Sequence, residues 1–422
     1  MTAAPKKSAA QNSASEFSIP EDAIPMGFRF AATRVGIKPS GRPDMACALA
    51  DQPATAVAMF TSNRVVAAPV VVGREHLQTT SGSVRVVIVN AGNANCATGV
   101  EGIAACTSVC QAAAEQFSCA PQEVFPSSTG IIGVPLPAEK LISAMPEIAS
   151  RLGSTAAHLQ QFAEAILTTD TRAKIAFARL MVNGAPVRLF GVAKGAGMIY
   201  PQLMPHATML VYLFTDARIS AADLPSLLHG AVEDTFNCIS IDGDTSTNDT
   251  VLLLASGASG VALTPVNASD MQAFAAALQQ VCASLARQII DDGEGVGHVV
   301  ELRIEEAASR ADALRVARSI AHSPLVKTAW AGCDPNWGRI LAAIGYSSVA
   351  IEPSRISIRI GGHLVCLNGG RAPGMDANQV HAAMLERNFQ VRVTLGMGSA
   401  SCNFLTSDLT AEYVRVNAEY ST

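Results

Sequence analysis

The sequence feature that most constrains the fold is a pair of alternating apolar runs, IAFARLMV and APVRLFGVA, separated only by Asn183 and Gly184. Both of these residues tolerate positive φ, so the dipeptide is a strong signal for a tight hairpin between two antiparallel strands. Further strands are predicted from the apolar runs VRVVIVNAG, TMLVYLF, HVVELRI, RISIRIGGHLVCL and QVRVTL. Because hairpins outnumber clear βαβ units, we expect most of the strand pairing to be antiparallel.

Helices are predicted between these strands. The segments GIAACTSVCQAAAEQFS and TAAHLQQFAEAILTT carry Ala, Leu and Gln at helical spacing. Two more helices have start signals, Ser220 with Asp223 and Ser269 with Gln272. Together, the elements predict a layered α/β fold with mixed, largely antiparallel sheets covered by helices.

Composition excludes several classes of protein. The chain has 422 residues, is 49% hydrophobic and carries a net charge of −5, which argues against a disordered or nucleic-acid-binding protein. No apolar run approaches the roughly 18 residues that a membrane helix needs. Ten scattered cysteines without a CxxC motif predict buried, reduced thiols in a cytoplasmic protein, and the eight histidines lack the spacing of a zinc site. We expect no metal and no cofactor, and a flexible tail over residues 1–26.

Polar and glycine-rich segments interrupt this pattern at five places. These segments are NAGNANCATG, SSTGIIGVPLP, IDGDTSTNDT, DDGEGVG and AGCDPNWGRI. Each one alone is typical of a surface loop. IDGDTSTNDT lacks the spacing of an EF-hand, and GGRAPG lacks the context of a phosphate-binding loop.

Thr208 has surroundings that suit a nucleophile. It follows the small residue Ala207 and a glycine-rich stretch that contains Lys194. If the peptide bond before Thr208 breaks, its α-amino group, with a pKa of about 7.7–8.0, can accept the proton of its own hydroxyl. Attack by the Thr208 hydroxyl on the Ala207 carbonyl would break that bond. Thr129 and Gly130 are the best candidates to stabilise the resulting oxyanion.

The motifs together resemble the glutamate N-acetyltransferase family of arginine biosynthesis, also called ornithine acetyltransferases or ArgJ-type proteins. The resemblance runs in order from Gly27 to Thr422. It is carried by NAGNANCATG, SSTGIIGVPLP, LTTDT, KGAGMI, ATML, IDGDTSTNDT, DGEG, DPNWGRI and SDLTAEYVRVNAEYST. It implies the autoprocessing fold of that family and cleavage into an α chain, residues 27–207, and a β chain, residues 208–422.

The resemblance also implies an activity and an assembly. The enzyme would move an acetyl group from N-acetylornithine to glutamate through an ester on Thr208, and some members also use acetyl-CoA. The two chains would stay associated, as a heterotetramer of two α and two β chains. The nucleophile falls on Thr208, the oxyanion pair on Thr129 and Gly130, and the substrate contacts on Thr168, Lys194, Glu294, Asn417 and Thr422.

The sequence departs from the family pattern before the nucleophile and after Glu294. Three extra residues lie in YPQLMPH, which places Thr208 fourteen positions after Lys194 rather than eleven. DGEGVGHVV replaces the usual DGEGATK and lacks its lysine. Two alternatives therefore stay open: an amidase that admits water to the same acyl-threonine, and an uncleaved, non-catalytic binding protein.

Overall fold

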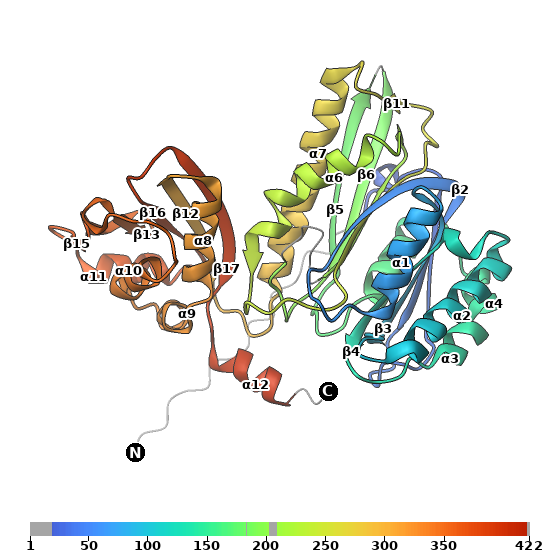
Figure 1. The fold of residues 1–422 in the computed structure, drawn as a ribbon, viewed down its shortest axis with the longest axis horizontal. Helices are drawn as coiled ribbons and strands as arrows, with labels where there is room; N and C mark the ends of the chain where they lie inside the picture. Colours follow the sequence, from blue (N-terminus) through green and yellow to red (C-terminus); the bar gives the residue numbers. More distant parts are fainter. Residues whose placement is uncertain (1–18, 183, 202–208, 420–422) are drawn as a thin grey trace.

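The computed structural model describes residues 19–182, 184–201 and 209–419, which form two lobes joined side by side (Figure 1). The first lobe is built on an eight-stranded mixed sheet in the order β4-β3-β2-β10-β7-β6-β5, with β1 paired to β2. Its strands are β1 (Phe28–Thr33), β2 (Met45–Phe60), β3 (Ser83–Asn93), β4 (Val124–Ile131), β5 (Lys174–Val182), β6 (Ala185–Lys194), β7 (Leu210–Thr215) and β10 (Thr250–Ala255). A small ribbon of β8 (Arg218–Ile219) and β11 (Ala262–Leu263) accompanies it.

Helices cover both faces of this sheet. On one face, α6 (Leu224–Glu233) and α7 (Ala268–Asp291) form a core with β5, β6, β7 and β10. On the opposite face, α5 (Ala156–Ala165) places Phe162 against Tyr212 and Phe214 of β7. The end of the sheet that contains β3 and β4 is covered by α1 (Ala68–Thr79), α2 (Gly99–Phe117), α3 (Ala138–Ser143) and α4 (Met145–Ser150) (Figure 1).

The second lobe is a seven-stranded sheet covered by four helices. Its order is β15-β14-β13-β16-β12-β17-β9. The strands are β9 (Ile239–Ser240), β12 (Val299–Ala307), β13 (Ser357–Ile360), β14 (His363–Leu367), β15 (Gly370–Arg371), β16 (Asn388–Thr394) and β17 (Ala400–Ser407). The helices are α8 (Arg310–Ala321), α9 (Pro324–Ala331), α10 (Trp337–Gly345) and α11 (Ala377–Met384). The last helix, α12 (Ala411–Glu419), lies beneath the junction of the lobes (Figure 1).

The predicted hairpin and fold class are confirmed. Strands β5 and β6 pair antiparallel up to Val182 and Ala185, so only two residues connect them, and Gly184 has a φ of 78°. Asn183 lies outside the described residues. Alternation explains the buried centre of the sheet: Val211 and Leu213 of β7 face α6 and α7, whereas Tyr212 and Phe214 face the opposite core. Most strand pairs in the described structure are antiparallel, as expected.

Two sequence-based expectations are wrong in detail. The helix α7 begins at Ala268 rather than after Ser269, because a turn that Asn267 closes on Thr264 ends the preceding segment there. Residues 19–26, which we expected to belong to a flexible tail, include Ile19 and Ile24, both buried in the core that contains α5. The apolar side chains of this segment thus hold it against the first lobe. Residues 1–18 lie outside the described structure.

The ten cysteines all belong to the described part of the chain and are unpaired thiols, nine of them buried. This confirms the expectation of buried, reduced cysteines. Among the helices that the structure describes, none combines the length and the apolar character needed to cross a bilayer.

Candidate active site

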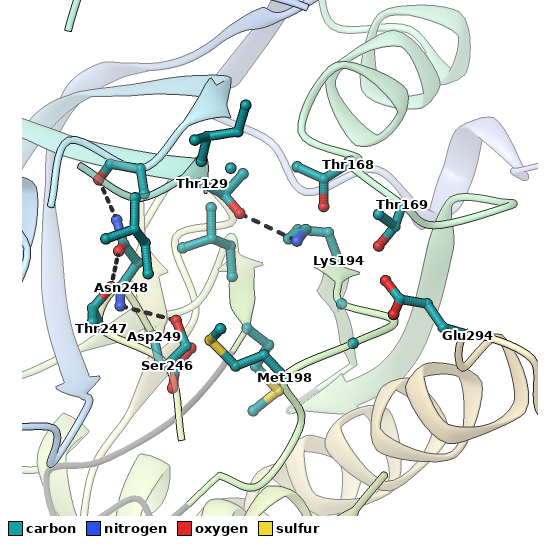
Figure 2. Close-up of a pocket in the computed structure, with 18 of the residues that line it drawn as sticks. Thr129, Thr168, Thr169, Lys194, Met198, Ser246, Thr247, Asn248, Asp249 and Glu294 are labelled. Carbon is teal, nitrogen blue, oxygen red and sulfur yellow. Dashed lines mark hydrogen bonds between the residues drawn. The ribbon is translucent and has the colours of Figure 1, made fainter. Parts of the chain in front are cut away.

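A cavity of about 320 Å³ opens in the first lobe where the carboxyl ends of β4 and β6 meet the amino ends of β7 and β10 (Figure 2). The segment after β6, the loop before β10, the Glu294 loop and α12 complete its wall. Its lining residues are Ala94, Thr129, Gly130, Ile131, Ile132, Thr168, Thr169, Lys194, Gly195, Gly197, Met198, Met209, Leu210, Ser246, Thr247, Asn248, Asp249, Glu294 and Asn417.

Thr129 and Gly130 lie at the carboxyl end of β4, where its pairing with β3 becomes irregular. Gly130 has a φ of 133°, and a Cβ there would lie 2.3 Å from the carbonyl carbon of Gly92. Only glycine fits this close approach of two backbones. The amide of Asn248 fixes the same strand by donating to the carbonyl oxygen of Ser128 at 2.8 Å. The bend that carries the predicted oxyanion donors is therefore held firmly from both sides.

Lys194 ends β6 and reaches Thr129 across the cavity (Figure 2). Its Nζ donates to the Thr129 Oγ1 at 3.2 Å, and this oxygen acts as the acceptor, so the Thr129 hydroxyl hydrogen stays available for another partner. Burial lowers the pKa of Lys194, and the nearby charge of Asp170 works in the opposite direction. Donation from a cation also polarises the Thr129 hydroxyl, which makes it a stronger donor.

Asp170 organises this side of the cavity, although the sequence analysis assigned it no role. One carboxylate oxygen accepts from the backbone N–H of Gly195 at 2.6 Å, and the other accepts from that of Thr168 at 3.1 Å. The second oxygen also lies 3.9 Å from Nζ of Lys194. Burial opposes ionisation of Asp170, but the charges of Lys194 and Lys174 outweigh it and hold its pKa below the usual range. The only signal in the sequence was the motif LTTDT.

A buried lysine joins Asp170 to a second carboxylate. Nζ of Lys174 lies 2.5 Å from Oδ1 of Asp170 and 2.6 Å from Oδ2 of Asp292. Asp292 also accepts from the backbone N–H of Thr171 at 3.1 Å. Since these groups are buried, the cluster can persist only while every member is paired. It ties the segment around Thr168 to the loop that carries Glu294.

Glu294 faces Lys194 from the opposite wall of the cavity (Figure 2). Its backbone N–H donates to the carbonyl oxygen of Ala196 at 2.9 Å, which ties its loop to the segment after β6. A Cβ on Gly197 would lie 2.4 Å from Oε2 of Glu294, so a larger residue at this position would displace the carboxylate. Asn417 of α12 donates its amide to the same Oε2 at 2.9 Å, which leaves Oε1 to accept from a ligand. An amine is a suitable partner for this carboxylate.

The structure brings together every predicted site residue that it describes. Six of them line the one cavity: Thr129, Gly130, Thr168, Lys194, Glu294 and Asn417. The predicted nucleophile Thr208, the cleavage residue Ala207 and the terminal residue Thr422 lie outside the described residues, as do residues 202–206 of the segment YPQLMPH that holds the three-residue insertion.

The two residues that follow Thr208 in the sequence belong to the described structure. Met209 and Leu210 line the cavity, and Leu210 pairs with Lys194 across β6 and β7. The carbonyl oxygen of Met209 accepts from the backbone N–H of Thr250 at 2.8 Å. We expected β7 to begin at Thr208, but the described strand starts at Leu210.

The cavity also contains lining residues that were not predicted from the sequence. Met198 and Thr169 come from segments quoted as family motifs, and Ser246 to Asp249 come from the polar run IDGDTSTNDT. The concentration of polar residues in that run was the available signal. His298, in the segment that departs from the family pattern, lies outside the cavity, and its Nδ1 lies 3.0 Å from Oδ2 of Asp408.

Comparisons with known proteins agree with these motifs. A model of the ArgJ family matches residues 29–422. The arginine biosynthesis bifunctional protein ArgJ of Geobacter sulfurreducens is 42% identical over 397 residues, which are 94% of this chain and 99% of that protein. The protein of the same name from Thermus thermophilus is 43% identical over 399 residues, with 94% and 99% coverage.

A solved structure of an arginine biosynthesis bifunctional protein ArgJ, from Bacillus halodurans, is also similar. It is 39% identical, with a TM-score of 0.48, and the match covers 50% of this chain and 98% of that one. The match of the family model to nearly the whole sequence, together with full-length relatives above 40% identity, confirms the resemblance drawn from the motifs. The chain belongs to the ArgJ family.

Proposed function

We propose that the cavity between Thr129 and Glu294 transfers an acetyl group from N-acetylornithine to glutamate through an ester on Thr208. Membership of the ArgJ family makes the chain an enzyme of arginine biosynthesis. The observation that carries the residue-level proposal is the gathering of six family-motif residues around one cavity, whose wall continues into Met209 and Leu210.

The first step of the proposed mechanism is cleavage of the chain. The hydroxyl oxygen of Thr208 attacks the carbonyl carbon of Ala207, and the amide nitrogen leaves with a proton. This step leaves an ester between Ala207 and the Thr208 hydroxyl and frees the α-amino group of Thr208. Water then hydrolyses the ester, which releases the carboxylate of Ala207 and restores the Thr208 hydroxyl. The Thr129 hydroxyl and the Gly130 N–H stabilise the oxyanion, and the contact from Lys194 supports the Thr129 donor.

Acetyl transfer repeats the same chemistry on the substrates. The α-amino group of Thr208 accepts the hydroxyl proton, and the oxygen attacks the acetyl carbonyl of N-acetylornithine. Ornithine leaves with its amine protonated, and the acetyl group stays as an ester. The amine of glutamate then attacks this ester, which gives N-acetylglutamate and restores the hydroxyl.

The charged residues of the cavity suit these two substrates. Both donor and acceptor are amino-acid derivatives with a carboxylate, and the presence of the cationic Lys194 in the cavity lining supports its proposed role in binding that group. Glu294 keeps one free carboxylate oxygen for an amino group, and Asn417 holds the other. Thr168 is proposed to contact the substrate beside Lys194. The substrate contact predicted for Thr422 remains part of the proposal.

Sheet topology supports association of the two proposed chains after cleavage. Strand β6 precedes the proposed scissile bond, β7 follows it, and the two pair antiparallel within the eight-stranded sheet. β10, from the second chain, pairs with β2, from the first. Cleavage would leave these interactions in place, because it breaks none of the ladder hydrogen bonds. We further propose a heterotetramer of two α and two β chains in the cytoplasm, with acetyl-CoA as an additional acetyl donor and no bound cofactor.

Intact-mass measurement of the purified protein tests the proposal. We expect two fragments, residues 1–207 and 208–422, and the addition of one acetyl group to the second fragment after mixing with N-acetylornithine alone. Thr208→Ala should stay as one chain because no hydroxyl remains, whereas Thr208→Ser should retain some cleavage. A folded wild-type protein that stays full length would refute the proposal and favour a binding protein. Release of acetate without transfer to glutamate would favour the amidase.

A further inference from the structure

A second cavity, of about 410 Å³, lies on the helical side of the second lobe, at its junction with the first. Tyr200 contributes to it from the segment that follows β6. Helix α8 contributes Arg315 and Arg318, His322 follows that helix, and Tyr346 follows α10. The cavity shares no lining residue with the candidate active site.

The guanidinium group of Arg318 is the distinctive feature of this cavity. Its Nε is buried and has no hydrogen-bond partner within the part of the chain that the structure describes. Its carbon lies 5.7 Å from the centroid of the Tyr200 ring, which supplies a cation–π contact but no acceptor. Arg315 differs, because it forms an ion pair with Asp312. A buried donor without an acceptor is costly, so this arrangement favours a ligand that supplies one.

Among the other titratable groups near this cavity, Lys327 adds positive charge, and Asp408 and Asp242 lie close enough to raise its pKa against the effect of burial. Lys327 is buried nearby, and its Nζ donates to the carbonyl oxygen of Ser407. Burial, with the charges of Lys327 and Arg318, lowers the pKa of His322 to about 4, so this ring is neutral near pH 7. Its Nε2 lies 3.0 Å from Oγ of Ser240. The lining residues of the cavity include no Asp or Glu.

We propose that the cavity beside Arg318 binds a small anion through a carboxylate or phosphate group. The planar guanidinium matches the paired oxygens of both groups, and the buried Nε supplies one of the donors. Tyr200 and the exposed Tyr346 also line this cavity. The proposal is independent of the acetyl-transfer mechanism, because this cavity shares no lining residue with the candidate active site.

The location also explains how such an anion would act on the fold. Tyr200 packs edge-on against His322 with ring centroids 4.3 Å apart, and its carbonyl oxygen accepts from Thr245 at 3.1 Å. Binding therefore engages residues of both lobes at the same point. A ligand that binds only the folded protein raises its stability in proportion to occupancy. We expect the anion to stabilise the junction between the lobes.

Calorimetric titration of the purified full chain with inorganic phosphate and, separately, with succinate tests the site and distinguishes the two anionic groups. Arg318→Gln should weaken binding about tenfold or more, since hydrogen bonds to charged groups are lost. Arg303→Gln is the matched control, because Arg303 is an exposed arginine of the same lobe that pairs with Glu305 at 2.6 Å. It should bind as the wild type does.

Thermal denaturation without added anion separates binding from a purely structural role. Arg318→Gln should denature no earlier than Arg303→Gln, because it removes a buried Nε donor that has no acceptor among the described residues. If Arg318→Gln fails to fold, Arg318→Lys becomes the test: it keeps the charge, loses the planar fork and should bind more weakly than the wild type. Wild-type affinity in either folded Arg318 variant, or no binding of phosphate or succinate by the wild type, would overturn the proposal. Binding of one probe alone would support it and identify the group.

Discussion

Replacing Asp170 by asparagine should shift the pH dependence of acetyl transfer. Nζ of Lys194 lies 3.9 Å from Oδ2 of Asp170, and at an effective dielectric constant of about 20 their attraction is about 4 kcal/mol. An energy of about 1.4 kcal/mol already changes a protonation equilibrium tenfold, so the loss of this charge should be measurable. Asp170→Asn keeps the size of the side chain and removes the charge.

The direction of the shift follows from the pKa of Lys194. Burial already holds this pKa below its usual value, and Asp170 partly counteracts the effect. Without Asp170 the pKa falls further, so the ammonium loses its proton at a lower pH. Because the neutral amine no longer provides a cation for Thr129 or for a carboxylate, activity is lost as pH rises. The decline of kcat/KM toward alkaline pH should therefore begin at a lower pH in Asp170→Asn than in the wild type.

Asp292→Asn is the matched control for damage to the buried cluster. Each substitution leaves Lys174 with one of its two carboxylates, and removal of one partner of a buried ion pair costs about 3–5 kcal/mol. Both variants should lose stability by comparable amounts, measured by urea denaturation. Only Asp170→Asn should move the alkaline limb of a kcat/KM profile recorded over a pH series. An alkaline limb that is unchanged in Asp170→Asn, or displaced equally in Asp292→Asn, would refute the reasoning.

Two further substitutions test the walls of the cavity. Thr129→Val keeps the shape of the side chain but removes its hydroxyl. It should therefore slow both chain cleavage and acetyl transfer by about 10²–10³-fold. Normal rates in this variant would show that Thr129 serves only as a turn residue. Gly197→Ala would place its Cβ 2.4 Å from Oε2 of Glu294 and should therefore raise KM in a steady-state assay, whereas Gly345→Ala, which meets no atom within 4 Å, should leave KM unchanged. An unaltered KM in Gly197→Ala would show that the Glu294 loop moves aside without loss of substrate binding.

Local sequence signals determined the elements that depend on near neighbours. The Asn-Gly dipeptide predicted the β5–β6 hairpin because the turn needs positive φ at its own positions. Helical spacing predicted α2 and α5, because a helix brings together residues only three or four positions apart. The start signal before α6 was also informative: Ser220 and Asp223 exchange hydrogen bonds and close the turn that precedes Leu224.

Element boundaries were less well determined. The start of α7 depended on the turn between Thr264 and Asn267 rather than on the polar residues at 269 and 272. The packing of Ile19 and Ile24 depended on a core formed by α5 and β7, far along the chain. Neither contact leaves a periodic pattern in its own segment.

The sequence by itself determined the family, the class of fold and the polar segments from which a site could be built. Only the tertiary structure decided how those segments meet. Strands β7 and β10 pair in parallel, and their amino ends lie next to the carboxyl ends of β4 and β6. At this place the fold brings together residues as distant in sequence as Thr129 and Asn417. The same holds for the charges: Lys174 and Asp292 are 118 positions apart, and their pairing at 2.6 Å exists only in the folded chain. Because burial and neighbouring charges set the pKa of Lys194, and both depend on contacts between distant segments, no local pattern could have predicted that burial lowers it and Asp170 opposes this effect.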